Sequence, residues 1–210
     1  MSSSPAMVIL GGGGHAAVVV EAARLAGFEL IGFLDDDSSA RLFDLPHLGP
    51  IAPWSPPVER RGTLVIHAAV GDGAKREAWI DLAHHTWGLA AAPVIHPSAV
   101  ISSTAAVLEG AFIGPRAVIN ARATVGRGVI INTGAIIEHD VAVGDFAHVA
   151  PGAVLGGAAA AGRRCLIGLN AAVLPGVRVG DEATLGAGAV ATRDVPNRTT
   201  YAGVPARVVA

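Results

Sequence analysis

Three consecutive polar residues in the second half of the chain, Glu138, His139 and Asp140, are its best candidates for chemistry. A histidine beside a carboxylate is suited to general-base catalysis, because the carboxylate can hold the imidazole and favour its protonated form. His148 follows as a second candidate. A surface histidine is usually only solvated, so what these two residues can do depends on where the fold places them.

A second group of candidate residues lies near the start of the chain and could bind an anion. The glycine run and histidine at 11–15 follow an apolar segment and precede an Ala- and Val-rich one, so backbone N–H groups and a helix N-terminus could meet a phosphate there. Asp35 and Asp36 end the next apolar segment, where a carboxylate could bind a ribose or another sugar. The spacing from Gly12 to Ala17 also approximates a dinucleotide fingerprint, and a tight turn without any ligand would explain the same glycines.

Strands and helices that would position this turn alternate along the first part of the chain. The apolar segments 7–10, 28–34 and 63–70 predict three strands. An Ala- and Val-rich segment over 16–25 predicts a helix, and a second helix is expected from 74 to 84. Alternating strands and helices with a Gly-rich first turn indicate a small Rossmann-like α/β domain with a parallel sheet.

From Ile95 to Val195 the chain repeats itself every six residues. The residue four places after each repeat position is always small and apolar, so both positions face inward in a strand, as Ala147 and Val149 do around an outward His148. A fixed hexapeptide period marks a parallel β-helix, and three hexads per coil would form a triangular prism with a narrow interior. The repeat positions are Ile95, Ile101, Val107, Ile113, Ile119, Val125, Ile131, Ile137, Val143, Val149, Leu155, Ala161, Ile167, Val173, Val179, Leu185 and Ala191.

This register divides the chain into two predicted domains, 1–92 and 93–210, and it places the candidate histidines. His139 falls on a corner of the prism, whereas His148 stands at the outward centre of a strand. Outward faces of a prism meet other subunits, so a site that uses both histidines is more natural between chains than within one. Outward apolar residues such as Val118 and Val154 also favour association, and we expect a homotrimer.

Composition narrows the function classes. The net charge is −2 and no basic run occurs, which disfavours nucleic acid as a partner. The apolar stretches are too short to span a bilayer and the start of the chain lacks a signal peptide, so we expect a cytoplasmic protein. Cys165, the single cysteine, takes an inward position and excludes an internal disulfide. The histidines are scattered, and no metal site is expected.

These motifs together resemble the bacterial hexapeptide-repeat acyltransferases that acetylate nucleotide-linked amino sugars, the sialic acid O-acetyltransferase-like group. The resemblance implies a left-handed β-helix, a homotrimer, and acetyl-CoA as co-substrate between adjacent prisms. The features that carry it are the turn Gly13-Gly14-His15, the pair Asp35-Asp36, the run Glu138-His139-Asp140, His148, the pair Gly156-Gly157 and the closing segment Gly203-Val204-Pro205-Ala206-Arg207.

The resemblance also implies a role for each site residue. His139 would be the general base, Asp140 would support it, and the backbone N–H of Gly157 would face the acetyl carbonyl. The positions expected to line the coenzyme are His148, Gly157, Leu169 and Ala187. Those expected to hold the sugar nucleotide are Gly13, Gly14, His15, Asp35 and Asp36.

The chemistry of these residues fits direct N-acetylation without an acyl-enzyme. An amine that attacks a thioester must shed a proton, for which histidine is the usual base near neutral pH. Two adjacent carboxylates favour a donor-rich sugar, and the resemblance points to a 4-amino-4,6-dideoxy sugar linked to UDP or GDP. Three alternatives remain: O-acetylation of a sugar hydroxyl, transfer from another acyl-CoA, and a non-catalytic β-helix that only binds nucleotide sugars.

Overall fold

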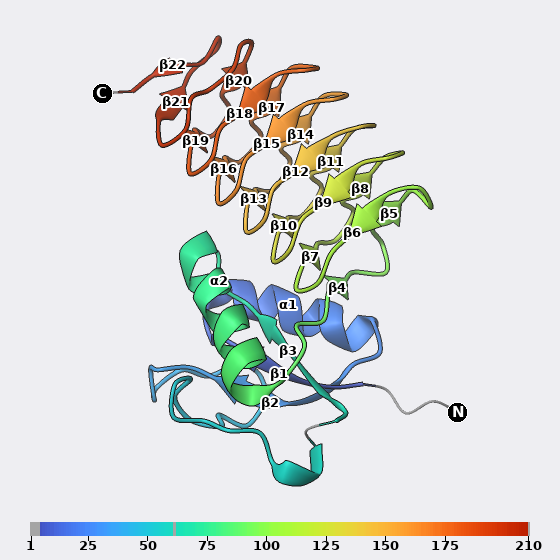
Figure 1. Cartoon of the computed structure of the whole chain (residues 1–210), viewed down its shortest axis with the longest axis vertical. Helices are drawn as coiled ribbons and strands as arrows, with labels where there is room; N and C mark the ends of the chain where they lie inside the picture. The colour runs from blue at the N-terminus through green and yellow to red at the C-terminus, as the bar shows by residue number, and fades with distance from the viewer. Residues whose placement is uncertain (1–4, 61, 210) are drawn as a thin grey trace.

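The structure is a computed structural model that describes residues 5–60 and 62–209. The first domain contains β1 (Ala6–Leu10), α1 (Gly14–Leu25), β2 (Glu29–Leu34), a 3₁₀ turn (Val58–Arg60), β3 (Leu64–Ala68), α2 (Gly73–Leu82) and a π-helical turn (Ala83–Trp87). Its sheet is parallel in the order β2-β1-β3, as expected of a small α/β domain (Figure 1). The third strand is shorter than the segment 63–70 that predicted it.

The central strand β1 is buried on both faces, which explains its continuous apolar sequence. Val8 and Leu10 belong to the hydrophobic cluster under α2, while Met7 and Ile9 belong to the cluster under α1. α1 buries an Ala- and Val-rich stripe against the sheet and ends before Gly27, whose φ of 85° suits glycine. The sheet is therefore packed between two helices, which position the ends of its strands.

The second domain is a left-handed parallel β-helix, and with the α/β domain it confirms the predicted fold class. Facing residues of successive coils are 18 positions apart, as for the pair Arg127 and Asp145, which confirms three hexads per coil. Both inward positions of the hexads form one continuous buried core, including Cys165. Burial raises the pKa of that thiol to about 12, so Cys165 is a core residue rather than a nucleophile.

Three sheets form the faces of the prism (Figure 1). The eight-stranded sheet contains β4 (Val94–Ile95), β7 (Phe112–Ile113), β10 (Ile130–Ile131), β13 (His148–Val149), β16 (Leu166–Ile167), β19 (Thr184–Leu185), β21 (Thr200–Ala202) and β22 (Arg207–Val208). The six-stranded sheet contains β5 (Val100–Ile101), β8 (Val118–Ile119), β11 (Ile136–Ile137), β14 (Val154–Leu155), β17 (Ala172–Val173) and β20 (Val190–Ala191). The five-stranded sheet contains β6 (Ala106–Val107), β9 (Thr124–Val125), β12 (Ala142–Val143), β15 (Ala160–Ala161) and β18 (Arg178–Val179).

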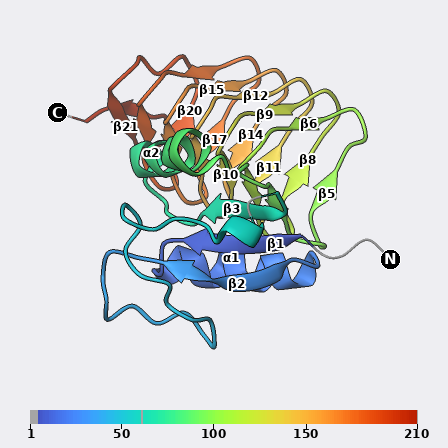
Figure 2. The same ribbon diagram turned by 60° about the horizontal axis from the view of Figure 1, so that its bottom comes forward.

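The α/β domain lies against one side of the prism, as the second view shows (Figure 2). It covers the outward faces of Phe112 and Ile130 on the eight-stranded sheet and the corner residue Phe146, all of which are buried. The division into domains 1–92 and 93–210 stays a prediction, and residues 1–4, 61 and 210 of those ranges lie outside the described residues. No helix in the described part of the chain is long and apolar enough to cross a membrane.

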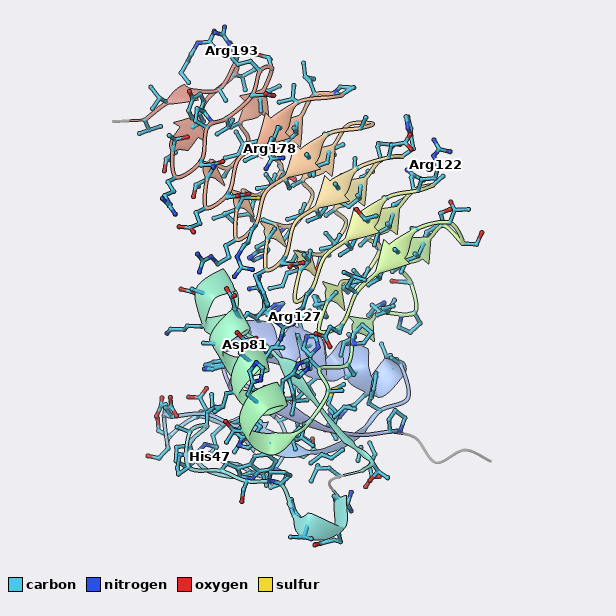
Figure 3. All side chains as sticks on the ribbon, viewed as in Figure 1. His47, Asp81, Arg122, Arg127, Arg178 and Arg193 are labelled. Carbon is cyan, nitrogen blue, oxygen red and sulfur yellow. The ribbon has the colours of Figure 1, made fainter. Side chains whose placement is uncertain are left out.

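Arg76 fastens the two domains together. This α2 side chain is 1% exposed and donates to five backbone carbonyls: Gly128 and Phe146 of the β-helix, each at 2.6 Å, Ala147 at 3.2 Å, and Val70 and Gly71 of its own domain, each at 2.8 Å. Burial lowers its pKa to about 10, so the guanidinium stays charged at neutral pH. Ion pairs extend the contact, among them Arg127 with Asp81 at 2.9 Å (Figure 3).

Candidate active site

A pocket of about 370 Å³ opens where β1, β2 and β3 end, the usual ligand position in a parallel α/β sheet. All five residues predicted to hold the sugar nucleotide line it, so the structure brings them together. The pocket is lined by Gly11, Gly12, Gly13, Gly14, His15, Asp35, Asp36, Ala69, Val70, Gly71, Lys75 and Trp79.

The glycine turn opens the N-terminus of α1 toward this pocket. A Cβ built at Gly13 or Gly14 would meet no atom within 4 Å, so there is free space above the turn. Asp35 holds the turn in place, because its two carboxylate oxygens accept from the N–H groups of Gly12 at 2.6 Å and Asp37 at 2.8 Å. The free N–H groups of the first helical turn can then meet an anion such as a phosphate.

Asp36 and Lys75 supply opposite charges to the pocket. One carboxylate oxygen of Asp36 accepts from the N–H of Ile51 at 3.0 Å, and its other oxygen, which has no hydrogen-bond partner in the described part of the chain, can accept from a donor on the ligand. Lys75 lies in the first turn of α2. The Asp72 side chain caps this helix by accepting a hydrogen bond from the backbone N–H of Lys75 at 3.0 Å. Together they suit a ligand with both an anionic and a donor-rich part.

His15 and His148 meet where the pocket reaches the β-helix. Their ring centroids are 6.5 Å apart, and His15 also packs edge-on against Phe112. The Nε2 of His148 lies 3.2 Å from the side-chain amide of Asn132. His148 does point outward from the prism as predicted, but the α/β domain of the same chain covers it.

These histidines are neutral at physiological pH. Burial, with smaller contributions from His67, His148 and Arg76, lowers the pKa of His15 to about 3. Burial lowers the pKa of His148 to about 4. Burial also lowers the pKa of His67, 1% exposed behind the pocket, to about 4, although its Nδ1 lies 2.9 Å from the Ala92 carbonyl. A second proton on any of them would place a charge beside the buried Arg76.

We expect the folded protein to lose stability as the pH falls from about 6.5 toward 4. Below pH 6.5 the unfolded chain binds a proton on each of these three histidines, whereas the folded chain does not. Each histidine therefore lowers the free energy of unfolding by about 1.4 kcal/mol for every pH unit of acidification. Urea unfolding at a series of pH values measures this slope. His67→Asn keeps a donor for the Ala92 carbonyl but does not titrate, so the slope of unfolding free energy against pH should decrease by the contribution of one proton. His85→Asn, at an exposed position, should leave the slope unchanged. An unfolding free energy that is constant across this window would contradict the expectation.

The Glu138-His139-Asp140 run forms a corner between β11 and β12, on the far side of the prism from this pocket. The Nδ1 of His139 lies 2.8 Å from Oδ2 of Asp140. A carboxylate only accepts, so Nδ1 carries the proton and Nε2 is left as the basic atom. Arg122, one coil earlier, also binds Asp140, and Figure 3 shows it at the prism corner remote from the α/β domain.

Gly157 lies beside the basic atom of His139. A Cβ on Gly157 would be only 2.7 Å from both Cε1 and Nε2 of the ring, so the imidazole edge packs directly on the glycine backbone. The Gly157 carbonyl accepts from the N–H of Gly176 at 3.0 Å, while the N–H of Gly157 has no hydrogen-bond partner among the described residues. A base and a free N–H donor therefore stand together, as acyl transfer requires.

Leu169 and Ala187 occupy a different corner, between the eight-stranded and six-stranded sheets. Leu169 follows β16, Ala187 follows β19, and the exposed fraction of Leu169 is 55%. The full width of the six-stranded sheet separates this corner from His139. Within one chain, the structure thus leaves the predicted coenzyme residues on two corners and one face. No group of three or more His, Cys, Asp or Glu side chains within 5–60 and 62–209 could hold a metal ion.

Comparisons with known proteins match both parts of this architecture. The family described as the PglD N-terminal domain matches residues 6–82, and the family described as the hexapeptide repeat of succinyl-transferase matches residues 161–193. A search of curated proteins gave no match. Among solved structures, a GDP-perosamine N-acetyl transferase from Caulobacter crescentus is 34% identical, with coverage of 98% of this chain and 97% of that one and a TM-score of 0.91. The chain belongs to this family of nucleotide-sugar acetyltransferases.

Two further solved structures are similar to this acetyltransferase over almost its whole length. The acetyltransferase domain of PglB from Neisseria gonorrhoeae is 32% identical, covers 98% of this chain and 100% of that one, and has a TM-score of 0.91. WeeI from Acinetobacter baumannii is 24% identical, covers 97% and 99% of the two chains at a TM-score of 0.87, and shows the shared fold. The resemblance inferred from the sequence motifs is therefore confirmed.

Sequence reasoning missed several residues around the site of this acetyltransferase: Lys75, Trp79, Arg76, Asn132 and Arg122. Lys75 and Trp79 could have been found, because they follow the 71–73 turn at the end of a predicted strand. Arg122 could have been found once the coil length was known, since it stands 18 positions before Asp140. Nothing in the sequence marks Arg76 as buried.

Proposed function

We propose that this chain transfers the acetyl group of acetyl-CoA to the amino group of a nucleotide-linked amino sugar. One observation carries the proposal: a relative that matches almost the whole chain is named as a GDP-perosamine N-acetyl transferase and was crystallised with CoA and GDP-perosamine. The PglB domain was likewise crystallised with acetyl coenzyme A. The pocket and the His139 corner described above supply the groups such a reaction needs.

In the proposed reaction, the sugar amine attacks the thioester carbonyl and forms a tetrahedral intermediate. Nε2 of His139 accepts the proton that the amine loses, while Asp140 stabilises the imidazolium through Nδ1. The free N–H of Gly157 stabilises the oxyanion. Collapse of the intermediate breaks the carbon–sulfur bond and releases CoA, which takes up the proton from His139. The products are the N-acetylated sugar nucleotide and free CoA thiol.

The pocket at the strand ends is the proposed site of the sugar nucleotide. Gly13, Gly14 and His15 would hold the pyrophosphate with Lys75, and Asp36 would accept hydrogen bonds from the sugar. Adjacent carboxylates favour an amine over an acidic sugar, which supports N-acetylation of a 4-amino-4,6-dideoxy sugar. The donor is a cytoplasmic metabolite, so we propose that the enzyme acts there.

We also propose a homotrimer, on the basis of an unpartnered apolar row. Outward side chains of the six-stranded sheet are apolar from its first strand to its last, which a lone solenoid has little reason to present. The row consists of Val100, Val118, Ile136, Val154, Ala172 and Val190. This sheet would face the threefold axis, and a fully active enzyme that sediments as a monomer would contradict the trimer.

Threefold packing on this sheet would complete the site between chains. The two edges of the sheet carry different corners, so His139 and Gly157 of one chain would stand beside Leu169 and Ala187 of the next. Behind that corner lie His148 and the nucleotide pocket of the same neighbouring chain. The base and the sugar amine, which lie on opposite sides of one prism, would then meet across the interface.

Mixed trimers test this arrangement through two variants that are inactive for different reasons. Gly13→Asp should fold well, because Gly13 is the uncapped N-cap of α1 at φ −84° and ψ −172°, and aspartate is a favoured N-cap. Its carboxylate would repel the phosphate, whereas His139→Ala removes the base. In trimers refolded from equal amounts of the two variants, half of the pockets are intact, and half of these intact pockets face an intact His139 of the neighbouring chain. Up to about a quarter of the wild-type activity should therefore return. No recovery after verified mixing would contradict a site shared between chains.

The function itself is tested with a panel of GDP- and UDP-linked amino sugars and acetyl-CoA. Free thiol release measures the turnover, and the stability of the product's acetyl group to mild alkali, which cleaves an ester but not an amide, shows whether it is on nitrogen or oxygen. We expect release to depend on a primary amine in the sugar. Equal release with the corresponding hydroxyl sugar would favour the O-acetyltransferase alternative, and no release with any acceptor would favour a non-catalytic binding protein.

A further inference from the structure

The imidazole of the proposed base is linked through one carboxylate to a residue in the previous coil. Nε and Nη2 of Arg122 donate to Oδ1 and Oδ2 of Asp140 at 2.6 and 2.7 Å. The same Oδ2 accepts the Nδ1–H of His139 at 2.8 Å. Asp140 is therefore shared between a permanent cation and the ring, and the three side chains form a continuous chain of hydrogen bonds.

The fold fixes both ends of this chain. Arg122 and Asp140 occupy equivalent corner positions with φ of 60° and 62°, so their side chains leave stacked coils in the same direction. The backbone N–H of Arg122 donates to the Thr104 hydroxyl at 3.1 Å, and that of Asp140 donates to the Ala121 carbonyl at 3.0 Å. The bidentate geometry is thus set by the register of the β-helix rather than by a chance surface encounter.

Charges around His139 are few, so the effect of Arg122 can be separated. Asp140 and Arg122 are the charged groups in its hydrogen-bond chain, and Gly157 on the other side of the ring is uncharged. The neighbouring Glu138 is bound by the Asn120 amide at 3.0 Å. The hydrogen bonds from Arg122, and second the one from His139, hold the pKa of Asp140 well below its usual range.

We propose that Arg122 is a positioning residue for the acetyl transfer: it fixes the carboxylate that orients His139 and offsets the negative charge of that carboxylate. An unpaired carboxylate would stabilise the imidazolium more strongly, and more of the enzyme would then be protonated and inactive as the pH falls. This inference rests on the proposed role of His139 as the general base.

Arg122→Gln tests the charge effect. The acidic limb of the kcat/KM profile should move to higher pH by about half a unit to one unit, with KM for both substrates nearly unchanged. Arg122→Lys keeps the charge but cannot bind in two places, so its limb should stay near that of the wild type while its plateau falls a few-fold. Asp140→Asn should move the limb the opposite way, to lower pH.

Two controls make the result decisive. Arg178→Gln removes the same charge from the exposed outer face of the five-stranded sheet, away from both proposed binding sites, and should leave the profile unchanged. An NMR titration of the His139 ring, without substrates, should show the same displacement in Arg122→Gln. If neither the ring titration nor the acidic limb moves, Arg122 has only a structural role. If the ring titration moves while His139→Ala retains normal turnover, the proposed base is wrong instead.

Discussion

His139→Ala is expected to lower kcat for acetyl transfer by about two to four orders of magnitude, the usual loss for a missing general base. The His139 side chain is 59% exposed, and within the described residues its hydrogen bond is the one to Asp140. Removing the ring therefore leaves no buried polar group without a partner. Folding and coenzyme binding should therefore be almost unaffected. Stopped-flow or steady-state thiol release, together with calorimetric binding of CoA, separates the two effects.

The pH profile of the residual activity gives a second measurement for this variant. Without His139, the amine must lose its proton to water or hydroxide, so the rate should rise steadily with pH instead of reaching a plateau. Exposed His85→Ala serves as the matched control and should retain both the rate and the profile. A His139→Ala enzyme with near-normal turnover and the wild-type profile would exclude the proposed role.

The hexad register predicted much of this site because it is a strict geometric rule. It placed His139 on a corner, Cys165 in the core and His148 on an outward face, and the structure has each of them there. The strand-and-turn pattern likewise marked Gly13 and Asp36 as candidate binding residues, and both line the pocket where the parallel strands end. Periodicity thus predicts positions along an element and the side that each residue faces.

Contacts between distant segments could not be predicted in this way. Arg76 lies in a helical segment whose sequence gives no sign of burial, yet five carbonyls satisfy its donors. Phe112 and Phe146 point out of the prism, and only the docked α/β domain explains why they are buried. The pairing of Arg122 with Asp140 depends on the coil length, which the hexad period alone does not determine.

Gly157→Ala is expected to lower kcat by about one to two orders of magnitude, because a small displacement of a catalytic group can cost that much. The added Cβ would lie 2.7 Å from Cε1 and Nε2 of His139, which is too close for any real contact. The ring must therefore turn away from the place where the sugar amine and the thioester would meet. The approach of the acetyl carbonyl to the Gly157 N–H would also be obstructed.

The backbone at this corner tolerates alanine, so a loss would report on the site and not on the fold. Ala121 and Ala187 occupy the equivalent hexad position in other coils, and Gly157 itself has no left-handed φ. The melting temperature should therefore stay close to that of the wild type. Substrate KM values should change less than kcat, because the base is displaced while the nucleotide pocket is untouched. If Gly157→Ala retained full turnover with an unchanged fold, the imidazole would not act from the position beside Gly157, and neither the base nor its oxyanion donor would be correctly assigned.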